Sequence, residues 1–179
     1  EIVVEELAER MVAKGHEVYC YNRKGHHVSG DKDNDLEEVK LYKGIHIITT
    51  PTFEKKSLNA FVYSVLATMH AVFQKYDVIH FHASGSCAMI PLAKLFGKHT
   101  VATIHGLDSQ RAKWGGFASK YLQFGEKMAA KYADELIVLS EGNRKYFKDM
   151  YDRNATLIPN GIDPQEIKEA KLIRERYGL

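Results

Sequence analysis

The sequence contains few cysteines and few prolines, and it has no long apolar run. There are two cysteines and four prolines in 179 residues. Cys20 and Cys87 belong to no C-x-x-C pair and to no histidine-rich metal motif, so reduced thiols of a cytosolic protein are expected. No apolar run reaches the roughly 18 residues of a membrane span, and no signal peptide is visible. These features exclude a small disulfide-rich domain and leave no candidate membrane span.

Charge of neither sign dominates the composition. Lys and Arg together number 25, Asp and Glu number 23, and the net charge is +2. This balance is too mild to indicate a nucleic-acid partner, and none is expected. A hydrophobic content of 45% is ordinary for a soluble globular protein of one domain. The G-x-G-x-x-G, G-x-x-x-x-G-K-[ST] and G-x-S-x-G motifs are absent, so a Rossmann dehydrogenase, a P-loop NTPase and an α/β-hydrolase are unsupported.

Short segments rich in Val and Ile alternate with amphipathic helical segments along the chain. This alternation predicts an α/β fold with a Rossmann-like, doubly wound parallel sheet covered by helices on both faces. Strands are expected at 16–21, 77–82, 100–104, 135–139 and 156–158, with a hairpin over 39–42 and 45–50. Helices are expected at 3–13, at 87–96, 117–132, 141–150 and 164–177, and after a cap at Ser57.

Polar and small residues follow four of these strands. In an open parallel sheet, ligands bind beyond the carboxyl ends of the strands. The residues at those ends are therefore candidates for substrate binding: His82, His105, Gly106, Ser140, Glu141, Asn160 and Gly161. Four consecutive polar ends are more than a packed core requires, which indicates a binding cleft.

Histidines supply the most distinctive side chains of this cleft. His80 and His82 point to the same face of their strand, but a zinc site needs at least a third ligand and none is identifiable, so no metal is expected. His80 is interpreted as a hydrogen-bonded core residue, whereas His82 could touch a ligand. His105 could donate hydrogen bonds to hydroxyl or phosphate groups, with Gly106 opening the backbone to a ligand. The alternative is a loop histidine that caps the next turn.

Two further segments have a functional and a structural interpretation. The loop with Arg111, Lys113 and Trp114 could hold a phosphate and stack on a sugar, or it could be solvated with Trp114 over the core. Ser140 and Glu141 open a helix, whose amides favour anions, although a glutamate there is also ordinary helix electrostatics.

Five segments in order resemble the N-terminal domain of bacterial glycosyltransferases of family 4, which have the GT-B fold. The segments are E-E-L-A-E-R-M-V-A-K-G-H-E-V (5–18), D-V-I-H-F-H-A (77–83), T-I-H-G-L-D-S-Q-R-A-K-W-G (103–115), A-D-E-L-I-V-L-S-E (133–141) and L-I-P-N-G-I-D (157–163). The stretch that follows Ile104 is similar to the subgroup called rhamnosyltransferases, which build cell-surface polysaccharides.

The resemblance implies a metal-independent, retaining transfer of a sugar from a nucleotide-sugar donor to a carbohydrate or lipid-linked acceptor. His105 would be the catalytic residue, Asp108, Ser109 and Arg111 would shape the acceptor side, and Asn160-Gly161 would lie at an interdomain crossover. Residues 1–163 would form the acceptor-side domain without its central first strand. Residues 164–179 would be a connector helix towards a C-terminal domain, and the fragment alone is expected to be inactive.

Other functions of the same architecture stay open. A non-catalytic carbohydrate- or nucleotide-binding module and a GT-B sugar-nucleotide epimerase are the alternatives, because fold alone does not decide function. The expected location is the cytoplasm, with possible contact at the inner face of the cell membrane. That contact would use the helix at 117–132, which carries Lys120, Lys127 and Lys131 beside Phe117, Tyr121, Leu122, Phe124 and Met128. Ordinary core packing with solvated lysines is the competing interpretation.

Overall fold

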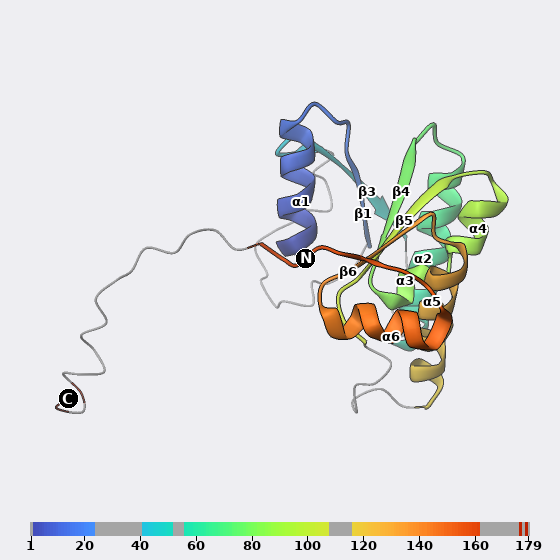
Figure 1. Ribbon diagram of the computed structural model, residues 1–179. Helices are drawn as coiled ribbons and strands as arrows, with labels where there is room; N and C mark the ends of the chain where they lie inside the picture. Colours follow the sequence, from blue (N-terminus) through green and yellow to red (C-terminus); the bar gives the residue numbers. More distant parts are fainter. Residues whose placement is uncertain are drawn as a thin grey trace.

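The strands form two sheets in the computed structural model, which describes residues 2–23, 41–51, 56–107, 116–161, 176 and 178 (Figure 1). One sheet has the order β1-β3-β2, with β1 (Tyr19–Arg23) parallel to β3 (Ile45–Thr50) and β2 (Leu41–Tyr42) antiparallel to it. The other has four parallel strands in the order β4-β5-β6-β7. Their bounds are Val78–His82, His99–Ile104, Glu135–Val138 and Thr156–Leu157.

The predicted α/β class with a parallel sheet is confirmed, with one difference in how the strands join. The strand predicted at 16–21 is β1, and it pairs with β3 in the three-stranded sheet. Strands β1 and β4 share no hydrogen-bonded ladder, so they belong to different sheets. The predicted hairpin is present as β2 and β3. Lys43 and Gly44 form its turn with positive φ angles of 49° and 79°. Such angles suit glycine, which explains the K-G pair at this position.

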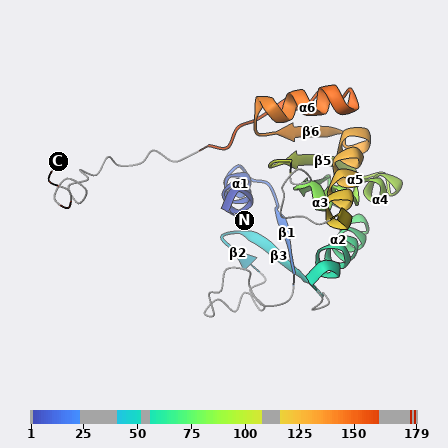
Figure 2. The ribbon, with the colours of Figure 1, turned by 90° about the horizontal axis from the view of Figure 1, so that it is seen from below.

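Six helices are described, and they are placed unequally around the sheets. They are α1 (Ile2–Ala13), α2 (Lys56–Val72), α3 (Ser84–Cys87), α4 (Ile90–Leu95), α5 (Gly116–Tyr132) and α6 (Glu141–Tyr151). Figure 2 shows α1 on one side of β1 and β3, whereas α2, α3, α4 and α5 gather on the other. The contacts α3·α5, α4·α5, α2·α4 and α2·α3 join these four into one layer.

Two helix predictions were wrong in detail. The helix expected over 87–96 is two short helices, because the chain breaks at Ala88 and Met89 and restarts with a proline in the first turn of α4. A proline suits a first turn, where its missing N–H is not needed. Ser57 lies inside α2 and is not its cap. The predicted connector helix at 164–177 falls outside the described residues, apart from residue 176.

The hydrophobic core belongs to the four-stranded sheet and the helices on it. Its buried members come from α2, β4, α3, α4, β5, α5, β6 and α6, and Phe147, Ile104 and Val138 are fully buried among them. Gly125 of α5 makes the closest approach in this layer. A Cβ at that position would lie 1.8 Å from the Ser84 backbone oxygen. The absence of a side chain thus allows α5 to pack directly on α3.

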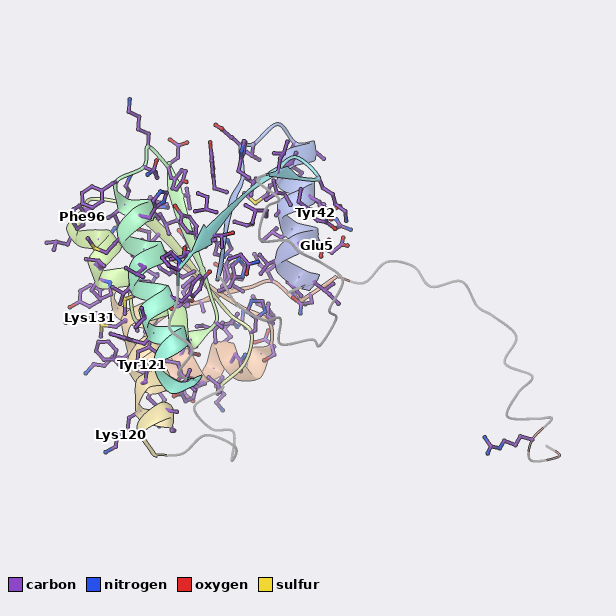
Figure 3. All side chains as sticks on the ribbon, turned by 180° about the vertical axis from the view of Figure 1, so that it is seen from behind. Glu5, Tyr42, Phe96, Lys120, Tyr121 and Lys131 are labelled. Atoms are coloured by element: carbon purple, nitrogen blue, oxygen red, sulfur yellow. The ribbon has the colours of Figure 1, made fainter. Side chains whose placement is uncertain are left out.

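Side chains attach the three-stranded sheet to the rest of the molecule. The Tyr21 hydroxyl lies 2.7 Å from His70 Nδ1, and the Tyr63 hydroxyl donates to the Tyr21 carbonyl at 2.6 Å. On the other side, the Tyr42 hydroxyl donates to Glu5 of α1 at 2.9 Å, in the region labelled in Figure 3. These contacts join β1 to α2 and β2 to α1.

Candidate functional site

The carboxyl ends of β4, β5, β6 and β7 meet at one edge of the parallel sheet. His82 pairs in register with Thr103, Ile104 with Val138, and Val138 with Leu157. The ladder continues past β7 through the Ile158 amide, which donates to the Val138 carbonyl at 3.0 Å. The residues that follow each strand are therefore held at neighbouring positions along this edge, as the pattern of polar strand ends predicts.

Two of the predicted site residues are in direct contact. His82 Nδ1 lies 3.1 Å from His105 Nε2, and the two rings are 5.4 Å apart between centroids. Both side chains are half-buried. Since β4 and β5 are adjacent and parallel, the residues that end them are brought together although they are 23 positions apart. One ring must donate to the other, so this bond couples the tautomers of His82 and His105.

His80 extends the histidine pair along the same strand face. Its Nε2 lies 2.7 Å from Thr103 Oγ1, and its ring lies 4.1 Å from the His82 ring. This bond agrees with the prediction of a hydrogen-bonded core histidine. The three histidines and the threonine form a continuous polar row, and His105 ends it at the carboxyl edge of the sheet.

Burial keeps the two inner histidines neutral. Loss of solvent, together with the nearby His105, lowers the pKa of His80 to about 4. The same loss of solvent, reinforced by His80 and His105, lowers the pKa of His82 to about 3. At physiological pH, His82 is therefore a neutral ring that offers one donor and one acceptor. A neutral partner orients His105 without an opposing fixed charge.

The backbone at the end of β4 is strained. Ala83 has φ 69° and ψ 157°. Residues other than glycine rarely adopt this backbone conformation, which costs of order 1–3 kcal/mol. The Ala83 amide still donates to the Thr103 carbonyl at 2.9 Å, and the Ser86 hydroxyl donates to the His82 carbonyl at 2.6 Å. The Tyr121 hydroxyl of α5 donates to Gly85 at 2.9 Å. These bonds hold a sharp turn directly beneath the histidine pair, and an alanine gives no sequence signal for it.

The remaining predicted residues are placed more loosely. Ser140 caps α6, accepting from the Asn143 amide at 3.2 Å, and Glu141 pairs with Arg144 at 2.9 Å. Both are exposed, as are Asn160 and Gly161 beyond β7. Gly106 follows His105 and is half-buried. Asp108, Ser109 and Arg111, with Lys113 and Trp114, lie outside the described residues.

A buried carboxyl group that the sequence reasoning missed lies behind this edge. Glu126 of α5 is 0% exposed. Its oxygens accept from the Ser84 hydroxyl at 3.4 Å and from the Tyr146 hydroxyl at 3.1 Å. Glu126 thereby links α5 to α3 and α6. The available signal was helical spacing, because Leu122, Ala129 and Ala130, one turn away on the same side of α5, are apolar.

Neither a metal centre nor a membrane span is found in the part of the chain that the structure describes. Within it, no three His, Cys, Asp or Glu side chains are placed to hold a metal ion. Among the same residues, no helix combines the length and the apolar character needed to cross a bilayer. The described residues of this edge offer imidazoles, a hydroxyl, the Glu141 carboxylate and the Asn160 amide.

Comparison with known proteins identifies the class to which this fold and edge belong. The family model described as Glycosyltransferase Family 4 matches residues 1–166, so the chain belongs to that family. Among solved structures it is similar to the sucrose-phosphate synthase of Thermosynechococcus elongatus, with a TM-score of 0.71 and 20% identity. That match covers 99% of this chain and 46% of the other, so the chain spans about half the length of that relative. The search of curated proteins gives no match.

Proposed function

We propose that the protein containing this chain is a retaining glycosyltransferase. It would transfer a sugar from a nucleotide-sugar donor to a carbohydrate or lipid-linked acceptor. In this reaction the bond between the anomeric carbon and the diphosphate oxygen breaks, and a bond to the acceptor oxygen forms. The proton of the acceptor hydroxyl passes to the diphosphate oxygen that departs, and the nucleoside diphosphate leaves with it. Membership of the family supports transfer in general, whereas the retaining course, metal independence and the identity of the substrates are our proposals.

The contact between His82 and His105 carries this proposal. His105 ends a buried strand, and a neutral ring 3.1 Å away orients it. A ring held in this way can direct a hydrogen bond at a sugar hydroxyl or at a reacting oxygen. Such a bond accelerates the reaction if it strengthens as charge develops in the transition state. In this proposal His105 is the catalytic residue and His82 is a positioning residue that acts through it.

The other residues have supporting roles in the proposal. Gly106 leaves room for the substrate beside His105. Ser140 and Glu141 follow β6, the strand next to β5. Asn160 and Gly161 would face a second domain. Asp108, Ser109 and Arg111 would contact the acceptor. The similarity of residues 105–115 to rhamnosyltransferases supports rhamnose as the donor sugar, cell-surface polysaccharide as the product and a bacterial, cytoplasmic enzyme.

A panel of nucleotide sugars tests the proposal, with release of nucleoside diphosphate by the full-length protein as the readout. Transfer to an acceptor from at least one donor is expected, and a donor that is bound but never transferred would contradict it. Conversion of the donor to its epimer, with no diphosphate released, would instead identify an epimerase. The 179-residue chain alone should not turn over, since the described residues of the histidine edge include no cationic cluster for a leaving diphosphate.

Substitution of the histidine pair tests the assigned roles. The variant His105→Ala should lower kcat by about 10²–10³ and leave the melting temperature nearly unchanged. We expect His82→Ala to lower kcat less, and His82→Asn to restore part of the loss, because an amide can still bond to His105 Nε2. His16→Ala, an exposed histidine on the loop after α1, is the matched control. A destabilised His105→Ala with normal kcat would show a purely structural histidine.

A further inference from the structure

The outer surface of α5 carries a stripe of exposed lysines with an aromatic residue inside it. Lys120, Phe124, Lys127 and Lys131 are all exposed, and Phe124 keeps 48% of its surface accessible. Their spacing of four, three and four residues places them on one side of the helix, over about 16 Å. Within the described residues none of the three lysines forms an ion pair with a carboxylate. The stripe is therefore a row of uncompensated positive charges.

Negative charge is missing from the whole helical layer around this stripe. The sequences of α2 and α4 contain no Asp or Glu, and α5 contains only Glu126, which is 0% exposed. Carboxylates follow these helices instead: Asp77 after α2 and Glu135 after α5 are exposed, and Asp134 is bound to Lys94 at 2.7 Å. In a chain whose charges nearly cancel overall, the helices α2, α4 and α5 themselves thus expose charge of one sign. The outer surface of α2, α4 and α5 is called the helical face below.

Large apolar side chains are exposed on the same helical face. Leu95 is 80% exposed and Phe96 is 41% exposed at the end of α4, and Phe73 at the end of α2 is 67% exposed. Phe73 and Phe96 contact each other edge to face, with centroids 5.2 Å apart. Figure 3 shows Phe96, Lys131, Tyr121 and Lys120 along one side of the molecule. Exposed apolar groups gathered beside lysines usually indicate an interaction surface.

We propose that the helical face is a docking surface for an anionic lipid bilayer. Lysines beside Phe and Leu match a membrane interface in both respects, because the cations meet lipid phosphates while the apolar groups enter the acyl boundary. The Tyr121 hydroxyl bonds to Gly85, immediately after the strained turn of β4. Lys120 and Tyr121, at the start of α5, thus lie near the carboxyl edge of the sheet, whereas Phe73, Leu95 and Phe96 precede β4 and β5 and lie at its amino-terminal edge. This inference concerns binding and does not depend on the proposed glycosyl transfer.

Flotation of the full-length protein with vesicles tests the proposal. Binding should be strong to vesicles that contain phosphatidylglycerol, weak to vesicles of phosphatidylcholine alone, and reduced by added salt. The double variant Lys127→Glu/Lys131→Glu should reduce partition onto anionic vesicles by at least about tenfold. The matched control Lys14→Glu/Lys145→Glu makes the same change of charge on α6 and after α1, and it should retain binding.

A second pair of variants separates the lipid from other occupants. Leu95→Ser/Phe124→Ser should weaken vesicle binding without altering the oligomeric state, whereas Met150→Ser, another exposed apolar residue, should not. Equal binding to neutral and anionic vesicles would overturn the proposal. So would retention on duplex RNA without vesicle binding, or a dimer in solution that Leu95→Ser/Phe124→Ser dissociates. Activity on a water-soluble acceptor should be unchanged in all four variants, so a failure here leaves the proposed reaction standing.

Discussion

Replacement of Gly125 by alanine should destabilise the protein although it improves the intrinsic helix propensity of α5. In an open helix, the change from Gly to Ala contributes about 1 kcal/mol of stability. Here the new Cβ would lie 1.8 Å from the Ser84 carbonyl oxygen and 2.9 Å from its carbon. The obstacle is backbone, which cannot rotate away as a side chain would. To reach even 3.0 Å, the shortest separation that real Cβ atoms tolerate, α3 and α5 must separate by about 1.2 Å.

The displacement would open a layer that is otherwise close-packed, so the cost should exceed the gain in propensity. We expect a net loss of at least about 2 kcal/mol in the free energy of unfolding. For a chain of this size that corresponds to a fall of about 4–8 °C in the melting temperature. Urea denaturation followed by circular dichroism measures the change, and the slope with denaturant should stay constant.

Gly142 provides the matched control, because it is also a helical glycine but lies in open surroundings. A Cβ there would meet only Ser140 Oγ, at 3.9 Å. Gly142→Ala should therefore stabilise the protein, by about 0.5 kcal/mol in the first turn of α6. If Gly125→Ala proves as stable as the parent protein or more so, the close approach of α5 to α3 described above is wrong.

Three further outcomes follow from individual side chains. Since the folded pKa values of His80 and His82 lie below the ordinary value of 6.5, the unfolded chain binds more protons between pH 6.5 and about 4. Stability should fall as the pH decreases through this range, and His80→Gln/His82→Gln should reduce the fall in urea titrations. Asp134 has a pKa lowered to about 2, chiefly by Lys94, so Asp134→Ala should cost about 1–3 kcal/mol at pH 7 and little below pH 2. Ala83→Gly should raise the melting temperature, with a gain of about 1 kcal/mol, whereas an unchanged or lower value would contradict the strain at that turn.

The regular elements could be predicted because local periodicity reflects burial. The bounds of β5 were predicted to within one residue. Its sequence, H-T-V-A-T-I, is covered on both faces and is therefore a compact, mainly apolar run. The break between α3 and α4 was missed because Ala88 and Met89 are good helix formers, although Pro91 in the first turn of α4 was a signal for it. Boundaries elsewhere shift by a few residues, as expected where ends are set by caps.

The site could be predicted as a set of strand ends but not as a set of contacts. The bond between His82 and His105 depends on the register of β4 against β5, which pairs His82 with Thr103. No local pattern specifies the alignment of two strands that are separated in the sequence by two helices, α3 and α4. The strain at Ala83 is likewise invisible, because alanine has no preference for a positive φ.

The division of the strands into two sheets has a consequence for how the protein opens. The central hydrophobic cluster contains no residue of α1, β1, β2 or β3. The three-stranded sheet is joined to the remainder through tyrosine hydroxyls and rings, such as Tyr21 with His70, and not through a shared ladder. A region with few contacts to the main core can unfold by itself at lower free energy than the whole. Backbone amides of β1 and β3 should thus exchange with deuterium well before those of β5 and β6, and the histidine row should persist while the sheet beside it opens and closes.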